Sequence, residues 1–132
     1  MAVPLPEMLP RAREHLEAAR RLQEEGLYAP AASRAYYAIV AAMLAGAGRP
    51  RERGRFHSRL RAMFVRAMHE RGVPGREARR IREGIEAAER DRVSADYYAR
   101  AVSPTAVEDH IRLAEEVIGM VEEWAREGDD EA

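Results

Sequence analysis

The hydrophobic positions of this chain recur at helical spacing along nearly its whole length. Between residues 8 and 25, apolar side chains follow one another at steps of three and four, which places them on one face of a helix. Residues 28–45 are apolar on nearly all sides, so this segment is expected to be a central helix surrounded by the others. The same periodicity predicts three more helices: one that begins near His57 or Ser58, one over residues 76–98, and one that begins at Ser103.

Glycine, proline and serine mark where these helices stop and start. Gly26 stands at the usual cap position after the first helix, and residues 45–56 read as one long loop because Gly and Pro interrupt them. Residues 71–75 form a turn, and Ser103-Pro104 matches an N-cap followed by proline in the first turn. The pattern predicts an all-α, five-helix up-and-down bundle: a single domain over residues 1–128 with an acidic tail over 129–132 that frays.

Composition supports this fold class and excludes several others. The chain holds 25 Ala, 22 Arg and 18 Glu among 132 residues but only 9 Val, 5 Ile and 1 Thr, which argues against an all-β domain. The absence of Cys excludes a disulfide scaffold. The longest uncharged run, residues 35–48, is shorter than the roughly 20 residues that cross a bilayer, and residues 1–6 show no secretion signal. We therefore expect a cytoplasmic protein without a membrane segment.

Charge is distributed unevenly along the chain, although the formal net charge is only −1. Residues 49–82 hold 12 Arg and 3 acidic residues, whereas residues 83–132 hold 5 Arg and 15 acidic residues. The arginines are densest at positions 49, 51, 53, 55, 59 and 61. This run is either a solvated loop neutralised by the acidic fifth helix, of the same chain or of a dimer mate, or a site for phosphate. The low aromatic content, 6%, argues against base stacking on a single strand.

Several common kinds of catalytic site lack their residues. The four histidines, at positions 15, 57, 69 and 110, are widely spaced and form no metal-binding motif. A phosphate loop of the Lys-containing type and a cysteine nucleophile are excluded because the chain has neither residue. No metal and no cofactor are expected. His15, His69 and His110 have no partner pattern and are expected at the surface.

Four short motifs, in order, give the chain a family resemblance. The segment Ser33-Arg34-Ala35-Tyr36-Tyr37-Ala38 follows a Gly-x-Tyr turn, and His57 opens the third helix. Arg92, followed by Asp96-Tyr97, ends the fourth helix, and a closing helix begins at Ser103. Together these motifs resemble the HEPN domain, and they cover nearly the whole chain.

The resemblance implies a helical bundle that forms a homodimer. Many members are encoded beside a minimal nucleotidyltransferase, and others are RNA-cleaving toxins with an Arg-x(4–6)-His motif. In that motif Arg holds the scissile phosphate and His transfers a proton near neutral pH, without a metal. This sequence departs from the motif: only Arg51 and His57 have the required spacing, before the third helix, and Asp96 or Tyr97 takes the place of the histidine after Arg92.

These motifs supply the candidate site residues. Arg34, Tyr37 and Arg92 are the candidates for binding a nucleotide phosphate, and Arg92, Asp96, Tyr97 and His57 are the candidates for catalysis. Each also has a structural interpretation. Arg34 would pair with an acid of the fourth or fifth helix, both Tyr36 and Tyr37 would be core residues, and His57 would be a first-turn residue. Arg92 and Asp96 have the i, i+4 spacing of a helical ion pair.

Three functions remain open from the sequence. The first is an accessory protein that dimerises, binds a nucleotide or nucleic-acid phosphate and pairs with a nucleotidyltransferase in a toxin–antitoxin-like module. The second is a metal-independent ribonuclease toxin that uses Arg51 with His57, or Arg92 with Tyr97. The third is a purely structural helical dimer.

Overall fold

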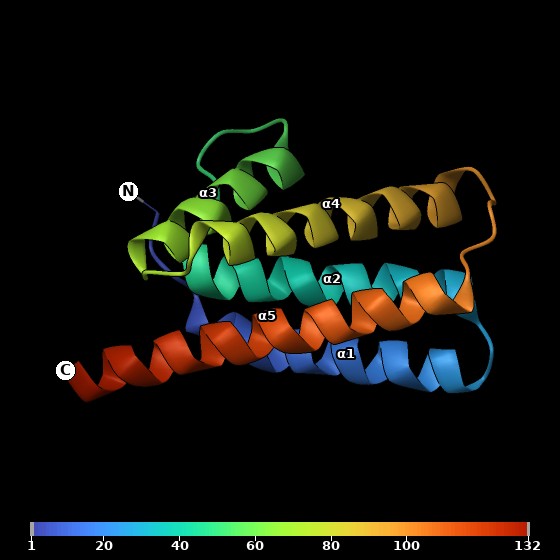
Figure 1. Ribbon diagram of the computed structural model, residues 1–132, viewed down its shortest axis with the longest axis horizontal. Coiled ribbons are helices and arrows are strands. Elements are labelled where there is room, and N and C mark those ends of the chain that lie inside the picture. The colour runs from blue at the N-terminus through green and yellow to red at the C-terminus, as the bar shows by residue number, and fades with distance from the viewer. Residues whose placement is uncertain (1, 132) are drawn as a thin grey trace.

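Five α-helices make up the fold in the computed structural model, which describes residues 2–131 (Figure 1). A short 3-10 turn, Pro6–Met8, precedes α1 (Leu9–Glu24), α2 (Tyr28–Ala47), α3 (Phe56–Glu70), α4 (Gly75–Tyr97) and α5 (Pro104–Glu131). Within residues 2–131 there is no strand. The predicted all-α class and the five helices are confirmed, and their ends lie within about two residues of the expected positions, except at the end of α5.

Helix α2 is the centre of the bundle, as its all-round apolarity predicts. Twelve of its 20 residues are buried, and it packs against each of the other four helices. Figure 1 shows α4 on one side of it and α1 and α5 on the other. Most of its buried side chains are alanines, which let the neighbouring helices approach closely.

The core is filled by the larger apolar side chains that the helices direct toward α2. Leu16 of α1, Phe64 of α3, Ile81 of α4 and Ile118 of α5 are each fully buried or nearly so. Helix α3 is the shortest of the five and covers one end of the α2–α4 pair (Figure 1). Its position leaves the other end of α4, which carries Arg92, beside the first half of α2.

Residues before α1 lie across the end of α2. The Leu5 amide donates to the carbonyl oxygens of both Leu44 and Ala45, at 3.2 and 3.1 Å. Gly48, with φ of +86°, ends α2 directly beneath the backbone of Val3, where a Cβ atom would collide with the Val3 carbonyl. The N-terminal segment is therefore held against the bundle.

Helix α5 begins where the sequence predicts and ends later. The Ser103 hydroxyl accepts a bond from the Ala106 amide at 3.1 Å, so the expected N-cap is present. The helix continues past Gly128 to Glu131, through most of the segment for which the sequence predicts a fraying tail. Ala132 lies outside the described residues.

Acidic side chains of α5 form ion pairs with arginines of α1 and α4 and with Arg71, which follows α3. Arg13 contacts Glu122 at 2.5 Å, Arg20 pairs with Glu115, and Arg80 pairs with Glu116. The loop arginines at positions 49, 53 and 55 are exposed. The split between a basic loop and an acidic helix therefore persists on the folded molecule. None of the helices in residues 2–131 combines the length and the apolar character that a membrane crossing requires.

Candidate functional site

A polar cluster lies where the end of α4 meets the first half of α2. Its centre is Arg92, whose guanidinium carbon lies 5.3 Å from the ring centre of Tyr36, 5.7 Å from Tyr37 and 5.9 Å from Tyr97. We call the following side chains the Arg92 cluster: Ser33, Tyr36, Tyr37, His57, Arg92, Asp96 and Tyr97. Helices α2, α3 and α4 each contribute to it, so it exists only in the folded chain.

Arg92 is a buried cation with one buried donor that has no partner in residues 2–131, a state that it shares with Arg59 Nε. The residue is 6% exposed, and its Nε has no hydrogen-bond partner within residues 2–131. The Asp96 carboxylate lies 3.9 Å from a terminal nitrogen, which is too long for a hydrogen bond. A buried charge with unfilled donors is costly, so such an arrangement is typical of a site that binds an anion.

Asp96 compensates this charge only in part. The predicted i, i+4 pair with Arg92 is present, but long, and the Asp96 side chain is one-third exposed. The Ser33 hydroxyl donates to the same carboxylate oxygen at 3.3 Å. Water and Ser33 therefore share the carboxylate with Arg92, and the guanidinium keeps donors for another acceptor.

His57 belongs to the Arg92 cluster although it lies in α3, one helix before Arg92. It is the second residue of α3, and its Nδ1 lies 2.8 Å from the Tyr36 hydroxyl. Burial raises the pKa of the Tyr36 phenol well above its usual range, and the Glu89 charge adds to that rise. The phenol thus keeps its proton and can donate it to an unprotonated Nδ1, which leaves the other ring nitrogen of His57 as a donor.

The local charges and burial keep His57 neutral. Burial is the main cause that lowers the pKa of His57, and the positive charges of Arg92 and Arg61 lower it further, against the opposing effect of Glu89. Glu89 is itself paired with Arg61 at 2.8 Å. At neutral pH the cluster therefore contains one cation that is only partly compensated, Arg92, and one neutral imidazole.

Tyr37 connects the cluster to a second polar pair. Its ring centre lies 5.8 Å from that of Tyr36 and 6.2 Å from that of His15. His15 Nδ1 lies 3.3 Å from a terminal nitrogen of Arg34, which is exposed. Arg34 therefore pairs with a histidine of α1, not with an acid of α4 or α5, and its link to Arg92 runs through His15 and Tyr37. Burial, and then the charge of Arg34, lower the pKa of His15.

Exposed tyrosines surround the guanidinium, which the low aromatic content did not indicate. Tyr97 is 72% exposed and Tyr37 is 36% exposed, while Tyr36 is buried. Tyr98, which follows α4, is 67% exposed. Few aromatic residues are present, but four of the five tyrosines lie at positions 36, 37, 97 and 98, where the end of α4 meets the first half of α2.

The comparison with protein families agrees with this arrangement of helices. The model of the HEPN domain matches residues 5–124, which is most of the chain. The chain belongs to the HEPN domain family. No curated protein matches it.

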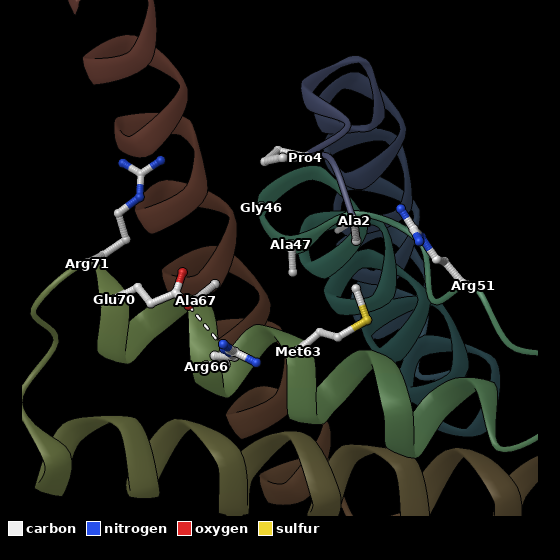
Figure 2. Close-up of a pocket in the computed structure, with 10 residues that line it drawn as sticks. All are labelled: Ala2, Pro4, Gly46, Ala47, Arg51, Met63, Arg66, Ala67, Glu70 and Arg71. Carbon is white, nitrogen blue, oxygen red and sulfur yellow. Dashed lines mark hydrogen bonds and ion pairs between the residues drawn. The ribbon is translucent and has the colours of Figure 1, made fainter.

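In this HEPN domain, Arg51 stands apart from the Arg92 cluster. Arg51 lines a cavity with Ala47 and Met63, and none of the residues around that cavity belongs to the cluster (Figure 2). His57, its partner in the Arg-x5-His spacing, faces Tyr36 instead. The sequence suggested two pairs, Arg51 with His57 and Arg92 with Tyr97. In the structure Arg92 lies near Tyr97, whereas His57 contacts Tyr36 of the Arg92 cluster and not Arg51.

The Arg92 cluster does not resemble a metal centre. In the part of the chain that the structure describes, no group of three or more His, Asp or Glu side chains is arranged to hold a metal ion. Cationic, phenolic and imidazole groups predominate around Arg92, and these are donors suited to an anion. What the cluster can do chemically is bind a negatively charged oxygen group and offer it hydrogen bonds.

Two histidines expected at the surface are in fact held by partners. His110 is 5% exposed, and its Nε2 lies 2.6 Å from an Asp91 carboxylate oxygen. His15 is half-buried against Arg34. The signal for His110 was in the helical pattern: it lies three residues after Val107 and four before Ala114, and both are core residues. No comparable pattern in the sequence indicated that the Ser33 hydroxyl would bond to the Asp96 carboxylate.

Proposed function

We propose that this HEPN domain binds a phosphate group of a nucleotide or nucleic acid at the Arg92 cluster, as an accessory protein rather than as a nuclease. The observation that carries the proposal is the Arg92 guanidinium, which is buried and whose Nε has no partner within residues 2–131. A bound phosphate oxygen would supply the missing acceptor and neutralise the buried charge.

The surroundings of Arg92 favour phosphate over a simple anion. Arginine presents a planar fork that matches phosphate oxygens, and the second ring nitrogen of His57 adds a neutral donor. The Tyr37 and Tyr97 rings offer faces on which a base can stack. Tyr97 is the most exposed ring beside the guanidinium.

The cluster favours binding over cleavage because it holds only one group suited to proton transfer near neutral pH. Metal-independent RNA cleavage needs a proton-transfer group that is poised near neutral pH. His57 is the group that comes nearest to that need, although burial lowers its pKa, while the pKa of Tyr36 is raised by burial and the Asp96 carboxylate repels phosphate. No second group therefore returns a proton to the leaving oxygen.

A ribonuclease is the second candidate because His57 lies inside the cluster. Its position against Tyr36, rather than in the loop before α3, puts an imidazole beside the arginine that would hold the scissile phosphate. RNA incubated with purified protein, with His57→Ala and with Arg92→Ala separates the two functions. Metal-independent cleavage by the native protein that is lost in either variant would establish the ribonuclease.

Binding is tested with a nucleotide monophosphate and a short RNA in calorimetric titrations. We expect Arg92→Ala to weaken binding at least tenfold and Arg34→Ala to weaken it less, since two rings, those of His15 and Tyr37, link Arg34 to Arg92. Arg82→Ala, at an exposed position of the same α4 helix, is the matched control and should bind like the native protein. Unchanged affinity in Arg92→Ala would refute the proposed site.

The proposed accessory role includes a homodimer and a nucleotidyltransferase partner of the minimal type. The family resemblance supports both, and the separation of a basic loop from the acidic α5 supports self-association. Co-purification from the native host, with identification of any bound protein, tests the partner. Recovery of the domain without a nucleotidyltransferase would count against that part of the proposal and leave the phosphate site standing.

A further inference from the structure

The cavity that Arg51 lines lies at the opposite end of α2 from the Arg92 cluster. Its volume is about 460 Å³, and α2, α3 and the N-terminal segment form its walls (Figure 2). Gly46, which lines it, comes ten residues after Tyr36, which is about 15 Å along a helix. The cavity shares no residue with the Arg92 cluster.

The floor of this cavity is apolar. Ala47 of α2 and Met63 and Ala67 of α3 line it, and Met63 reaches from α3 toward Ala47 and Ala2 (Figure 2). The backbone bonds of Leu5 to the end of α2 hold Pro4 in the cavity wall. Small side chains at the end of α2 thus leave room that the core does not fill.

The rim of the cavity is cationic. Arg51, Arg66 and Arg71 stand around it, with Glu70 as the single acidic residue among its lining side chains. Arg71 is also paired with Glu127 of α5 at 3.4 Å, so an entering anion competes with that exposed carboxylate as well. Arg66 and Glu70 pair at 3.1 Å, but their side chains are 82% and 66% exposed. Ion pairs this exposed are weak, so an entering anion can exchange with Glu70 at little cost.

We propose that this cavity binds a small amphipathic carboxylate: an acyl chain or an aromatic ring against the apolar floor, with the carboxylate on Arg66 and Arg71. The volume falls in the range of small-molecule sites. A stable protein partner would need an interface of roughly 1,000 Å² or more, which a cavity with ten lining residues does not provide. The proposal is independent of the phosphate site.

Trp124 gives the experiment a direct signal. It is the single Trp of the chain, and the Arg71 guanidinium carbon lies 5.2 Å from its ring centre. A carboxylate that binds Arg71 changes the charge beside the indole and so its fluorescence. Octanoate is the probe, and octylammonium, with the same chain and the opposite charge, is the matched ligand.

We expect octanoate to change the Trp124 emission saturably at one equivalent per chain, and octylammonium to bind at least tenfold more weakly. Ala67→Phe fills the floor and should abolish the octanoate response, while Ala18→Phe, at a half-buried position of α1, should leave it unchanged. Equal responses to the two ligands, or no saturable response to octanoate, would overturn the proposal.

A second pair of variants tests the rim without changing the floor. Arg66→Gln should weaken octanoate binding several-fold. Arg21→Gln removes an exposed arginine whose i, i+4 contact with Glu17 is also 3.1 Å, and it should have no effect. Octanoate binding retained in Arg92→Ala shows that the two sites are separate; binding lost in that variant would contradict the location proposed here.

Discussion

Arg61 and Arg92 show how differently two largely buried arginines can be used. Arg61 lies 2.8 Å from Glu89 and 3.6 Å from Glu86, so its charge is compensated within the fold. Arg92 has three tyrosine rings and a carboxylate at 3.9 Å, which compensate it less well. We interpret Arg61 as an arginine that stabilises the fold and Arg92 as one that the fold holds for a ligand.

This difference predicts opposite outcomes for one substitution at the two positions. Arg92→Met removes an unfilled donor and leaves Asp96 hydrated and bonded to Ser33, so we expect the free energy of unfolding to change by less than about 1 kcal/mol. Arg61→Met leaves Glu86 and Glu89 unpaired and should cost about 1–3 kcal/mol. Urea denaturation checks both variants. A larger loss from Arg92→Met than from Arg61→Met would mean that Arg92 is structural.

The lowered pKa of His57 predicts that the free energy of unfolding decreases as the pH falls below neutral. The unfolded chain binds the proton near pH 6.5, whereas the folded chain binds it only at lower pH, so acid favours unfolding. His15, whose pKa is also lowered, acts in the same direction. Denaturation between pH 7.5 and 5.5 should show the free energy of unfolding decreasing as pH falls, and His57→Gln should reduce that decrease.

The matched variant for this measurement is His69→Gln, at an exposed position of the same α3 helix. An identical pH dependence in His57→Gln and in the native protein would show that His57 contributes nothing to it.

At the residue scale, the sequence supplied the candidate residues of the cluster but not the contacts between them. Arg92, Tyr37 and Asp96 became candidates because their order and spacing match a family motif. The contact between His57 and Tyr36 joins residues 21 positions apart, and that between Ser33 and Asp96 joins residues 63 apart. Such pairings depend on how helices pack, and periodicity within one helix carries no information about them.

At the scale of the helix, the alanines of α2 determine how closely its neighbours pack. Ala38 and Ala42 are both fully buried. Replacing either with Phe adds a ring where no space is available, and should cost about 1–3 kcal/mol. Ala62→Phe, at an exposed position of α3, is the control and should unfold at nearly the native temperature. Thermal midpoints that are equal for all three variants would show that α2 is not tightly enclosed.

Two glycines that end helices allow a matched comparison of backbone strain. Gly26 and Gly48 both have positive φ, of +76° and +86°, but only Gly48 lies against another segment, the backbone of Val3. Gly26→Ala should therefore cost about 1 kcal/mol from conformation alone. Gly48→Ala should cost clearly more, because the N-terminal segment must also move. Chemical denaturation of the two variants gives the difference, and equal losses would mean that the contact with Val3 adds nothing.

The ends of the helices could be predicted where the sequence carries a capping residue. Gly26 and Ser103 fixed the end of α1 and the start of α5 closely. The end of α5 was missed because Gly128 and the acids after it argue for fraying, while the structure continues the helix to Glu131. The crossing of the N-terminal segment over α2 had no local signal, since it depends on a close approach between residues 3 and 48.

At the scale of the whole molecule, the uneven charge predicts self-association. Acidic side chains of α5 and the exposed arginines of residues 49–55 lie on one chain that is nearly neutral overall, so two copies can bring opposite charges together. We expect light scattering to give about twice the 14.9 kDa mass of the chain at micromolar concentration. A mass near 15 kDa at low salt would contradict the dimer, and a dimer that persists unchanged at high salt would show that charge is not its cause.

The enclosure of α2 also determines how its backbone exchanges hydrogen with the solvent. Because the other four helices pack against it, local fluctuations expose little of its backbone, and its slowest amides exchange when the whole domain opens. A ligand raises the free energy of that opening by an amount set by its concentration and affinity, wherever it binds. Phosphate at the first half of α2 and a carboxylate at its end should therefore slow the same central amides, so that exchange measured on this one helix reports the occupancy of either site.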